Sequence, residues 1–540
     1  MPEFACWWKE GVVYQIYPRS FQDSNEDGIG DIKGIVNRLQ YLQWLGVSAI
    51  WLSPIYRSPM HDFGYDISDY RYIDPAFGTM EDVLELISQA HAIGIKIIFD
   101  MVLNHTSHQH AWFKESAGNV KNSKRDFYIW HEVRDDKKPN NWLAAFGGSA
   151  WTIHRETNQY YLHSFLKEQP DLNWRNPAVV QAVFGEVAYW LDMGVDGFRL
   201  DVINLIGKNQ LLKDNPFGIG ATIRPYDMQK HIYDRNDSLA HSKLKEFRKL
   251  LERYRERMLV GEIMVEKPGS PEIAASYLGN GNDELHLAFD FSFTWLPWNA
   301  GKWKTAAEKW YACIPTEGWP CWVLSNHDVV RAITRFGNNV FKAKIAALFL
   351  LTQKGTPFIY YGEEIGMKDK RLPRKSIQDP VGKRYWPFHP GRDGQRRPMQ
   401  WNGSCQAGFS SHETWLPLHQ EYLHSSVESQ QNDSKSLLDF YRNLILLRNK
   451  DTVLRLGDCE YLPVEVPTVL CYMRKYVGEY RLILLNFSRR STRISITPIL
   501  KSIERISLCM LLSTDSGYLD EIYDGVIMLH GFQGIVFSLT

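Results

Sequence analysis

Eight short apolar segments recur along the chain and constrain its fold more than any other feature. They are rich in branched aliphatic and aromatic residues and end in polar or charged residues, as buried parallel strands do. The segments cover 11–18, 47–54, 95–105, 195–202, 258–263, 285–291, 321–328 and 356–364, and helical patterns between them cover 82–94, 176–194 and 242–258. This alternation predicts an α/β fold, a (β/α)8 TIM barrel.

Two parts of the chain depart from this alternation. Residues 104–176 follow the third strand and are rich in Trp, His, Asn and Gly, which predicts a small inserted domain. Residues 456–540 contain short segments of alternating character, which predict a C-terminal antiparallel β-sandwich domain. The barrel is then expected in two parts, 1–103 and 177–455, with a further excursion at 211–237 after the fourth strand.

The composition argues against charged partners. The chain of 540 residues has 62 Lys and Arg and 62 Asp and Glu, so no net charge attracts nucleic acid or an anionic membrane. Its seven cysteines form no CxxC pair, which argues against a thiolate metal site and a disulfide framework. Aromatic residues make up 13%, with 19 Trp, and their flat faces suit sugar rings. We expect a neutral, polyhydroxylated substrate.

Neither export nor membrane insertion is predicted. The first residues lack a basic segment followed by an apolar one, and no apolar run is long enough to span a bilayer. We therefore expect a soluble, cytoplasmic protein.

Polar and charged side chains gather at the carboxyl ends of four predicted strands. In TIM barrels, active sites lie at this end of the strands. These side chains are Asp100, Asn104 and His105 on the third strand, Arg199 and Asp201 on the fourth, Glu262 on the fifth, and Asn326, His327 and Asp328 on the seventh. One such residue alone is more often a cap or a structural partner than a catalytic group. Four strand ends of this character together predict an active site.

The spacing of two of these residues suggests paired carboxylates. Arg199 and Asp201 are two residues apart on a strand and project to the same side, so the guanidinium is expected to keep Asp201 ionised by lowering its pKa. Glu262 has no basic neighbour in the sequence and follows an apolar run, so burial would keep it protonated. One charged and one protonated carboxyl is the pairing used in glycoside hydrolysis.

The motifs around these residues resemble a known family. "DMVLNH", "GFRLD", "VGEI" and "SNHD", in this order, resemble the four signature regions of the α-amylase family, glycoside hydrolase family 13. "QPDLN" at 169–173 resembles a fifth region of its oligo-1,6-glucosidase branch. "PMHDFGYDISDY" at 59–70 and "GRDGQRRPMQW" at 391–401 resemble sugar-gripping loops of the same branch. The likeness extends from about Trp7 into the C-terminal β domain.

The resemblance implies an α-glucosidase that retains anomeric configuration by double displacement. Asp201 matches the nucleophile, Glu262 the acid that later acts as base, and Asp328 the third carboxylate, which grips the sugar's 2- and 3-hydroxyls. The resemblance also implies that Arg199, His105 and His327 line the glucose site and that Tyr65 stacks on the ring.

Three further residues bear on specificity by the same resemblance. Asp62 and Arg392 match a pair that holds the 4-hydroxyl of a terminal glucose, which makes the site a pocket and the enzyme exo-acting. The alternative is that 391–401 is only a surface salt-bridge loop, and it departs from the family loop at Gln395 or Arg397. Val at position 202 is similar to the residue found there in enzymes of the branch that accept α-1,6 bonds, and α-1,4 activity also stays open. The alternative is that Val is present only because it favours a strand.

Other functions stay open on the sequence alone. A glucosyl-transferring relative, such as a trehalose synthase or a sucrose isomerase, would share the same three carboxylates. A trehalose-6-phosphate hydrolase would need a phosphate grip, and none is identified. A non-catalytic barrel of the transporter-chaperone type is disfavoured because Asp201, Glu262 and Asp328 are all present.

The segment "DSNEDGIGD" resembles the first part of an EF-hand loop. The expected ligands of a structural Ca²⁺, or alternatively Mg²⁺, are Asp23, Asn25, Asp27, the carbonyl of Ile29, and Asp31. Gly34 stands where an EF-hand has its bidentate Glu, and several members of the resembled branch bind Ca²⁺ at such a loop. The alternative is a turn with solvated acids.

Overall fold

The computed structural model describes residues 6–135, 137–220, 222, 224–266, 269–502, 507–515 and 525–539. Ala221 and Ile223, within the expected excursion at 211–237, lie outside the described residues.

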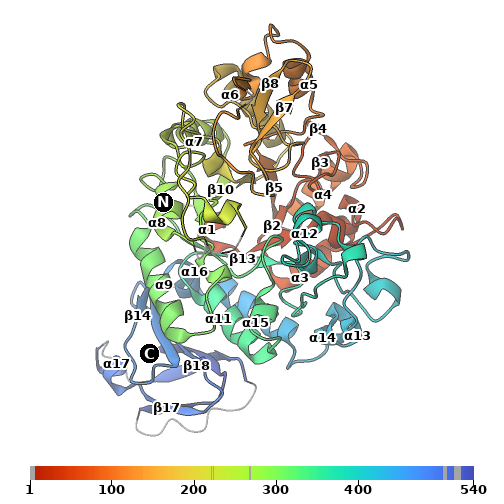
Figure 1. The fold of residues 1–540 in the computed structure, drawn as a ribbon. Helices are drawn as coiled ribbons and strands as arrows, with labels where there is room; N and C mark the ends of the chain where they lie inside the picture. Colours follow the sequence, from red (N-terminus) through yellow and green to blue (C-terminus); the bar gives the residue numbers. More distant parts are fainter. Residues whose placement is uncertain are drawn as a thin grey trace.

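The eight predicted strands form one parallel sheet that curves into a barrel (Figure 1). They are β1 (Val13–Ile16), β2 (Ala49–Leu52), β5 (Lys96–Val102), β9 (Gly197–Asp201), β10 (Met258–Glu262), β11 (Leu287–Phe289), β12 (Cys321–Val323) and β13 (Thr356–Tyr360). Their hydrogen-bonded order is β11-β10-β9-β5-β2-β1-β13-β12. The first and last strands of this order, β11 and β12, approach each other where the Cys321 thiol donates to the carbonyl of Ala288 (3.1 Å). The barrel confirms the fold class predicted from the sequence.

The barrel interior is largely apolar, whereas β9 directs charged side chains into it. Apolar inward side chains of the other seven strands form one cluster, with Val13, Ala49, Trp51, Ile98, Met258, Val260, Leu287, Phe289, Cys321, Val323 and Phe358. On β9, Gly197 pairs with Ile98 and Arg199 with Asp100, so the inward positions of this strand are Gly197, Arg199 and Asp201. The charged residues therefore stand directly above a packed core.

Helices surround the barrel on its outer face. The main ones are α3 (Leu39–Leu45), α4 (Met80–Ala92), α6 (Pro177–Asp192), α7 (Ser238–Leu251), α8 (Pro271–Ser276), α9 (Ala300–Cys313), α11 (Val340–Thr352) and α15 (Leu437–Lys450). The Asn176 side chain caps α6 as predicted, by accepting from the N–H of Ala178. Helix α7 ends at Leu251, earlier than predicted, because Glu256 has a left-handed φ of 57° and Met258 already belongs to β10.

The inserted segment forms a small sheet of its own above the barrel in Figure 1. Its strands β6 (Trp130–Glu132), β8 (Gln159–Leu162) and β7 (Trp151–His154) are antiparallel in this order, and helix α5 (Ala111–Gly118) lies beside them. Trp142, Trp151 and Leu162 form its core. A short hairpin of β3 (Tyr56–Arg57) and β4 (Asp69–Ile73) brings the loop 58–68 to the same side.

The C-terminal domain lies at the opposite end of the molecule (Figure 1). Its antiparallel sheet has the order β14 (Asp458–Tyr461), β15 (Val469–Tyr476), β16 (Glu479–Asn486), β20 (Gly534–Leu539) and β18 (Leu508–Ser513), and β17 (Thr492–Ser495) pairs with β19 (Val526–Leu529). The domain confirms the predicted β character, whereas the residue boundaries of the four domains remain a prediction.

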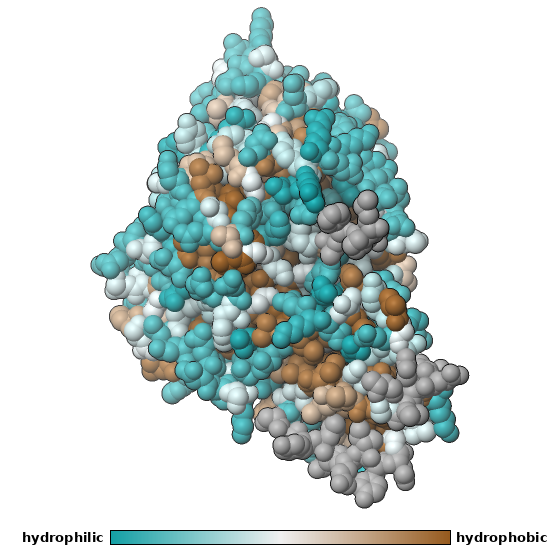
Figure 2. Space-filling model, turned by 180° about the vertical axis from the view of Figure 1, so that it is seen from behind, coloured by the Kyte–Doolittle hydropathy of each residue, from teal (hydrophilic) through white to brown (hydrophobic). Residues whose placement is uncertain are grey.

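Figure 2 shows a surface on which hydrophilic residues predominate, with scattered apolar patches. No helix in the described part of the chain is long and apolar enough to cross a membrane.

Two buried arginines connect the barrel to the C-terminal domain. Arg448 on α15 donates to the carbonyls of Leu351 (2.9 Å), Leu454 (2.9 Å) and Gly355 (2.7 Å). Arg474 on β15 donates to the same Leu454 carbonyl (3.0 Å). Both arginines are fully buried, and burial lowers the pKa of Arg448 to about 9. The junction is therefore held by charge-assisted bonds to backbone carbonyls that have no access to water.

Replacing Arg448 by Met should destabilise the protein markedly. The variant leaves several buried carbonyls without a donor, which predicts a loss of about 3 kcal/mol. Arg442→Met on the same helix is the matched control, because Arg442 is only partly buried and bonds to a single carbonyl, that of Trp44 (3.3 Å). Thermal melts of the two variants compare them, and equal shifts would contradict the role assigned to Arg448.

Candidate active site

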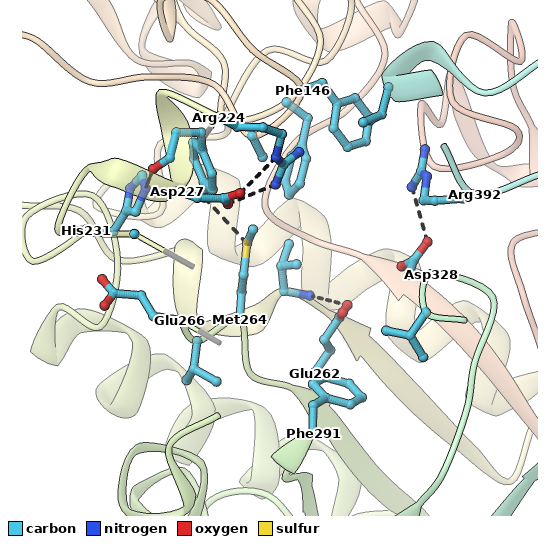
Figure 3. A pocket seen from close by; sticks show the side chains of 18 of the residues that line it. Phe146, Arg224, Asp227, His231, Glu262, Met264, Glu266, Phe291, Asp328 and Arg392 are labelled. Atoms are coloured by element: carbon cyan, nitrogen blue, oxygen red, sulfur yellow. Dashed lines mark hydrogen bonds and ion pairs between the residues drawn. The ribbon is translucent and has the colours of Figure 1, made fainter. Parts of the chain in front are cut away.

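The polar strand ends gather around one pocket of about 500 Å³ (Figure 3). Eight of the ten predicted catalytic and substrate-binding residues line it, namely Asp62, Tyr65, His105, Asp201, Val202, Glu262, Asp328 and Arg392. The other two, Arg199 and His327, are hydrogen-bonded to members of this set. The site residues proposed from the sequence thus come together in space.

Arg199 lies at the centre of the site and contacts three carboxylates. Its Nη1 donates to Asp100 (2.7 Å) and to Asp201 (2.8 Å), and its Nη2 contacts Oε2 of Glu262. Glu262 also faces the backbone N–H of Val202 (3.4 Å). Glu262 has no basic neighbour in the sequence, but in the structure Arg199 is its neighbour because β9 and β10 are adjacent strands.

The predicted pKa shift of Asp201 is wrong in direction. Burial raises the pKa of Asp201 well above its ordinary value, Arg199 lowers it, and the negative charges of Glu262 and Asp100 raise it further. One guanidinium cannot neutralise three carboxylates, so the pKa of Asp201 stays raised although Arg199 is in contact with it.

Asp328 lies across the pocket and is the most strongly paired of the carboxylates. It accepts from Arg396 (2.7 Å) and Arg392 (3.2 Å), and it lies 3.4 Å from Nε2 of His327. Burial alone would raise the pKa of Asp328, but His327 and these arginines lower it well below its ordinary value. Asp328 is therefore ionised at neutral pH.

A buried ion pair lines the pocket. Arg392 bonds to Asp62 (2.7 Å), and Asp379 holds the same guanidinium from behind (2.7 Å). Asp62 is 3% exposed, so the pair is part of the pocket and not a surface salt bridge. In Figure 3, Arg392 and Asp328 lie on one side of Glu262, and Arg224 and Asp227 lie on the other.

A buried carboxylate fixes the loop that carries Asp62 and Tyr65. Asp66 accepts from the hydroxyl of Ser58 (2.9 Å) and from the N–H groups of His61 (2.9 Å) and Asp62 (3.0 Å). Burial raises the pKa of Asp66 to about 6, although these bonds oppose the rise. The loop is thus held by side chain to backbone bonds that the sequence motif does not reveal.

Two predicted residues have unexpected local geometry. Val202 has a left-handed backbone (φ 35°, ψ 44°), which is strained for a β-branched residue. This turn directs the chain away from β9 immediately after Asp201. His105 bonds through Nε2 to the carbonyl of Tyr65 (3.0 Å), and burial lowers the pKa of His105 to about 4, so it is neutral.

The excursion at 211–237 forms the wall of the pocket that the sequence did not predict. Arg224 and Asp227 make a bidentate pair there (both bonds 2.9 Å). The pocket opens beside exposed apolar side chains, namely Ile219, Met228, Trp295 and Val330. The only sequence signal for this wall was the length of the excursion itself.

The expected metal loop has a different arrangement of its acids. Asp31 caps α2 (Ile32–Asn37) by accepting from the N–H of Gly34 (2.6 Å), and it also accepts from Ser24 (2.7 Å). Asp23 accepts three backbone N–H groups of the loop. Within the described ranges, no three His, Cys, Asp or Glu side chains are grouped as metal ligands. The remaining oxygen donors still suit a hard cation, so Ca²⁺ stays a prediction.

Comparison with known proteins identifies the family. The model of the catalytic domain of alpha amylase matches residues 15–457. The chain belongs to the α-amylase family. It is 41% identical over 497 residues to a probable alpha-glucosidase of Rhizobium meliloti strain 1021, which covers 89% of each chain. It is 40% identical over 520 residues to the oligo-1,6-glucosidase of Parageobacillus thermoglucosidasius, covering 90% of this chain and 91% of the relative.

A solved structure shares the whole architecture of this chain. The alpha-glucosyl transfer enzyme XgtA superposes with a TM-score of 0.92 at 38% identity, covering 99% of this chain and all of XgtA. The protein is thus a glycoside hydrolase of the α-amylase family, and the identity of its substrate is a separate question.

Beneath the loop that carries His327 and Asp328 lies a buried acid. Glu363, just after β13, accepts from the hydroxyl of Tyr441 (3.1 Å) and contacts the hydroxyl of Ser325. Burial raises the pKa of Glu363 to about 7, while these two bonds lower it. The folded protein therefore binds this proton more tightly than the unfolded chain does, where the pKa of a Glu is about 4.3.

This proton predicts a pH dependence of stability. A carboxyl whose folded pKa is raised contributes stability below its unfolded pKa and loses that contribution as the pH rises through the folded pKa. Melting temperatures should therefore fall for the wild type between pH 5 and pH 8 more steeply than for Glu363→Gln, which stays neutral throughout. Parallel curves for the two proteins would contradict the raised pKa.

Proposed function

We propose that the protein is an exo-acting, retaining α-glucosidase that releases glucose from the non-reducing ends of short α-glucosides. The observation that carries the proposal is the contact of one guanidinium, that of Arg199, with both Asp201 and Glu262 in a pocket lined by Arg392 and Asp62. This arrangement supports two carboxyls acting on one bond, next to a charged pair that can hold the hydroxyl of a terminal sugar.

Each carboxyl then has a defined part in two displacements. The Asp201 carboxylate attacks the anomeric carbon while Glu262 gives its proton to the departing oxygen, which leaves a glucosyl ester on Asp201. Glu262, now a carboxylate, takes a proton from water as that water attacks the same carbon and releases α-glucose. Asp328 is ionised and supports the positive charge that develops on the flattened ring.

The linkage and the acceptor are the finer parts of the proposal. Val202 lines the pocket next to Asp201, and we expect α-1,6 bonds to be preferred with α-1,4 bonds also cleaved, a preference worth about 1–3 kcal/mol. A second candidate is glucosyl transfer to another molecule in place of water. The similarity to the alpha-glucosyl transfer enzyme XgtA favours this candidate.

A comparison of rates on five sugars tests the proposal. We expect glucose from isomaltose faster than from maltose, little from sucrose, trehalose or trehalose-6-phosphate, and slower release as isomaltose is lengthened. NMR should detect α-glucose before the β anomer. Asp201→Asn should reduce the rate by roughly 10⁴-fold or more, whereas Asp192→Asn on the exposed surface of α6 should not. Isomerised disaccharides as the main products would favour the transfer enzyme.

We also propose that the loop 23–31 binds a structural Ca²⁺, with Mg²⁺ as the alternative, through Asp23, Asn25, Asp27, the Ile29 carbonyl and Asp31. Saturating Ca²⁺ should stabilise the protein by about 2.7 kcal/mol at one hundred times its dissociation constant. Melting with EDTA and with Ca²⁺ added back measures this shift. Asp27→Asn should abolish it, and Glu26→Gln, on the exposed neighbour, should keep it. Identical melts with EDTA and Ca²⁺ would reject the site.

A further inference from the structure

Gln15 is a buried amide in an otherwise apolar strand. It lies on β1 two residues after Val13 and faces the barrel interior with it, and it is 2% exposed. Its Nε2 lies 2.8 Å from Nδ1 of His327 and 3.5 Å from the hydroxyl of Ser53. An amide nitrogen donates and cannot accept. Nδ1 of His327 therefore accepts this bond and carries no proton.

The proton of a neutral His327 must then lie on Nε2. Nε2 is 2.7 Å from the hydroxyl of Tyr65, and that hydroxyl is 3.0 Å from Oδ2 of Asp100. A tyrosine has one O–H, and the carboxylate can only accept. Tyr65 therefore donates to Asp100 and accepts from His327. One directed series of hydrogen bonds therefore runs from Gln15 to Asp100, and Asp100 also accepts from the central guanidinium of Arg199 (2.7 Å).

The opposite direction of the chain is unfavourable at both ends. If Tyr65 donated to His327, its lone pairs would face the carboxylate of Asp100, and the proton on Nδ1 would face the amide N–H of Gln15. Each of these is a buried contact between groups of the same polarity, which costs about 1–3 kcal/mol per unsatisfied group. The position of the Gln15 amide nitrogen thus decides which group donates in each of these hydrogen bonds.

The surroundings keep His327 neutral. Its ring lies beside those of Tyr17 and Tyr65, with centroids 6.0 Å and 5.4 Å away. Burial lowers the pKa of His327 to about 3.

The charged groups that face His327 come from three elements. Asp328 on its own loop raises the pKa of His327, while Arg396 and Arg392 from the loop after α12 (Pro380–Tyr385), and Arg199 from β9, lower it. A neutral imidazole has two tautomers, and its function depends on which nitrogen carries the proton.

We propose that Gln15 is a positioning residue that fixes the proton of His327 on Nε2 and so aligns Tyr65 and Asp100 with Arg199. The proposal rests on the proposed glucosidase function, because its readout is the rate of glucoside cleavage. Gln15 touches neither the pocket lining nor the paired carboxylates, and it acts through His327.

Gln15→Glu is the informative variant because its side chain changes from donor to acceptor with pH. When the introduced carboxyl is ionised, it accepts from Nδ1–H of His327. This reverses the donor and acceptor roles in the hydrogen bond between His327 and Tyr65. When this carboxyl and the imidazole together gain a proton, Nε2 again carries hydrogen and donates to Tyr65, whichever of the two holds the added proton. Gln15→Met has a similar size, forms no such bond, and does not titrate.

The experiment measures kcat/KM on an aryl α-glucoside against pH for the full-length wild type and both variants. Both variants should be about 10–100-fold slower than wild type at neutral pH, the range found when a metal-binding histidine loses the bond that orients it. The ratio of Gln15→Glu to wild type should rise as the pH falls, whereas the ratio of Gln15→Met to wild type should stay constant. Two constant and equal ratios would overturn the proposal.

Two further measurements separate this role from packing. Ser53→Ala removes the other hydrogen-bond partner of the Gln15 amide and should keep nearly the wild-type rate. A loss of rate equal to that of Gln15→Met would contradict the proposal that Gln15 acts through His327. In a double-mutant cycle, Gln15→Met and Tyr65→Phe should combine to less than the product of their single effects, since both break the same chain. Independent, multiplying effects would also overturn the proposal. A wild type inactive on every α-glucoside would instead reject the proposed function.

Discussion

The central constraint on the site is that one guanidinium contacts three carboxylates. Arg199 stands in the barrel interior with Asp100, Asp201 and Glu262 around it, and its one charge is divided among three carboxylates. Burial and the neighbouring carboxylates therefore keep the pKa of Asp201 raised in spite of Arg199. The register of the strands enforces this arrangement, because Asp100 pairs with Arg199 across β5 and β9, and Glu262 directly follows the pair of Gly261 and Leu200 across β10 and β9.

Much of this site follows from the sequence for a simple physical reason. Side chains alternate along a strand, and parallel strands end at one edge, so Asp201, Glu262 and Asp328 could be assigned to one site without coordinates. The direction of the Asp201 pKa shift could not, because the sequence shows the arginine two residues away and hides Asp100 and Glu262 on neighbouring strands. The wall made by Arg224 and Asp227 also has no periodic pattern that would place it.

Residues that hold the site in position were the hardest to predict. Asp66, Asp379 and Gln15 each act on a residue far away in the chain or on backbone N–H groups, and their own sequence context suggests a loop acid or a strand residue. The one usable signal is a polar side chain inside an apolar strand, as at Gln15 in "VVYQIYP". A buried amide must have a partner, although the sequence cannot say which.

The charged pair in the pocket also bears on the order of events in the proposed reaction. Arg392 and Asp62 line the pocket where the proposed terminal sugar would rest, and the exposed side chains of Ile219, Met228 and Trp295 line it as well. In the proposed reaction, the detached half of a substrate departs before water or another acceptor enters. The monosaccharide would then leave last, so we expect free glucose to compete with fresh substrate as product accumulates.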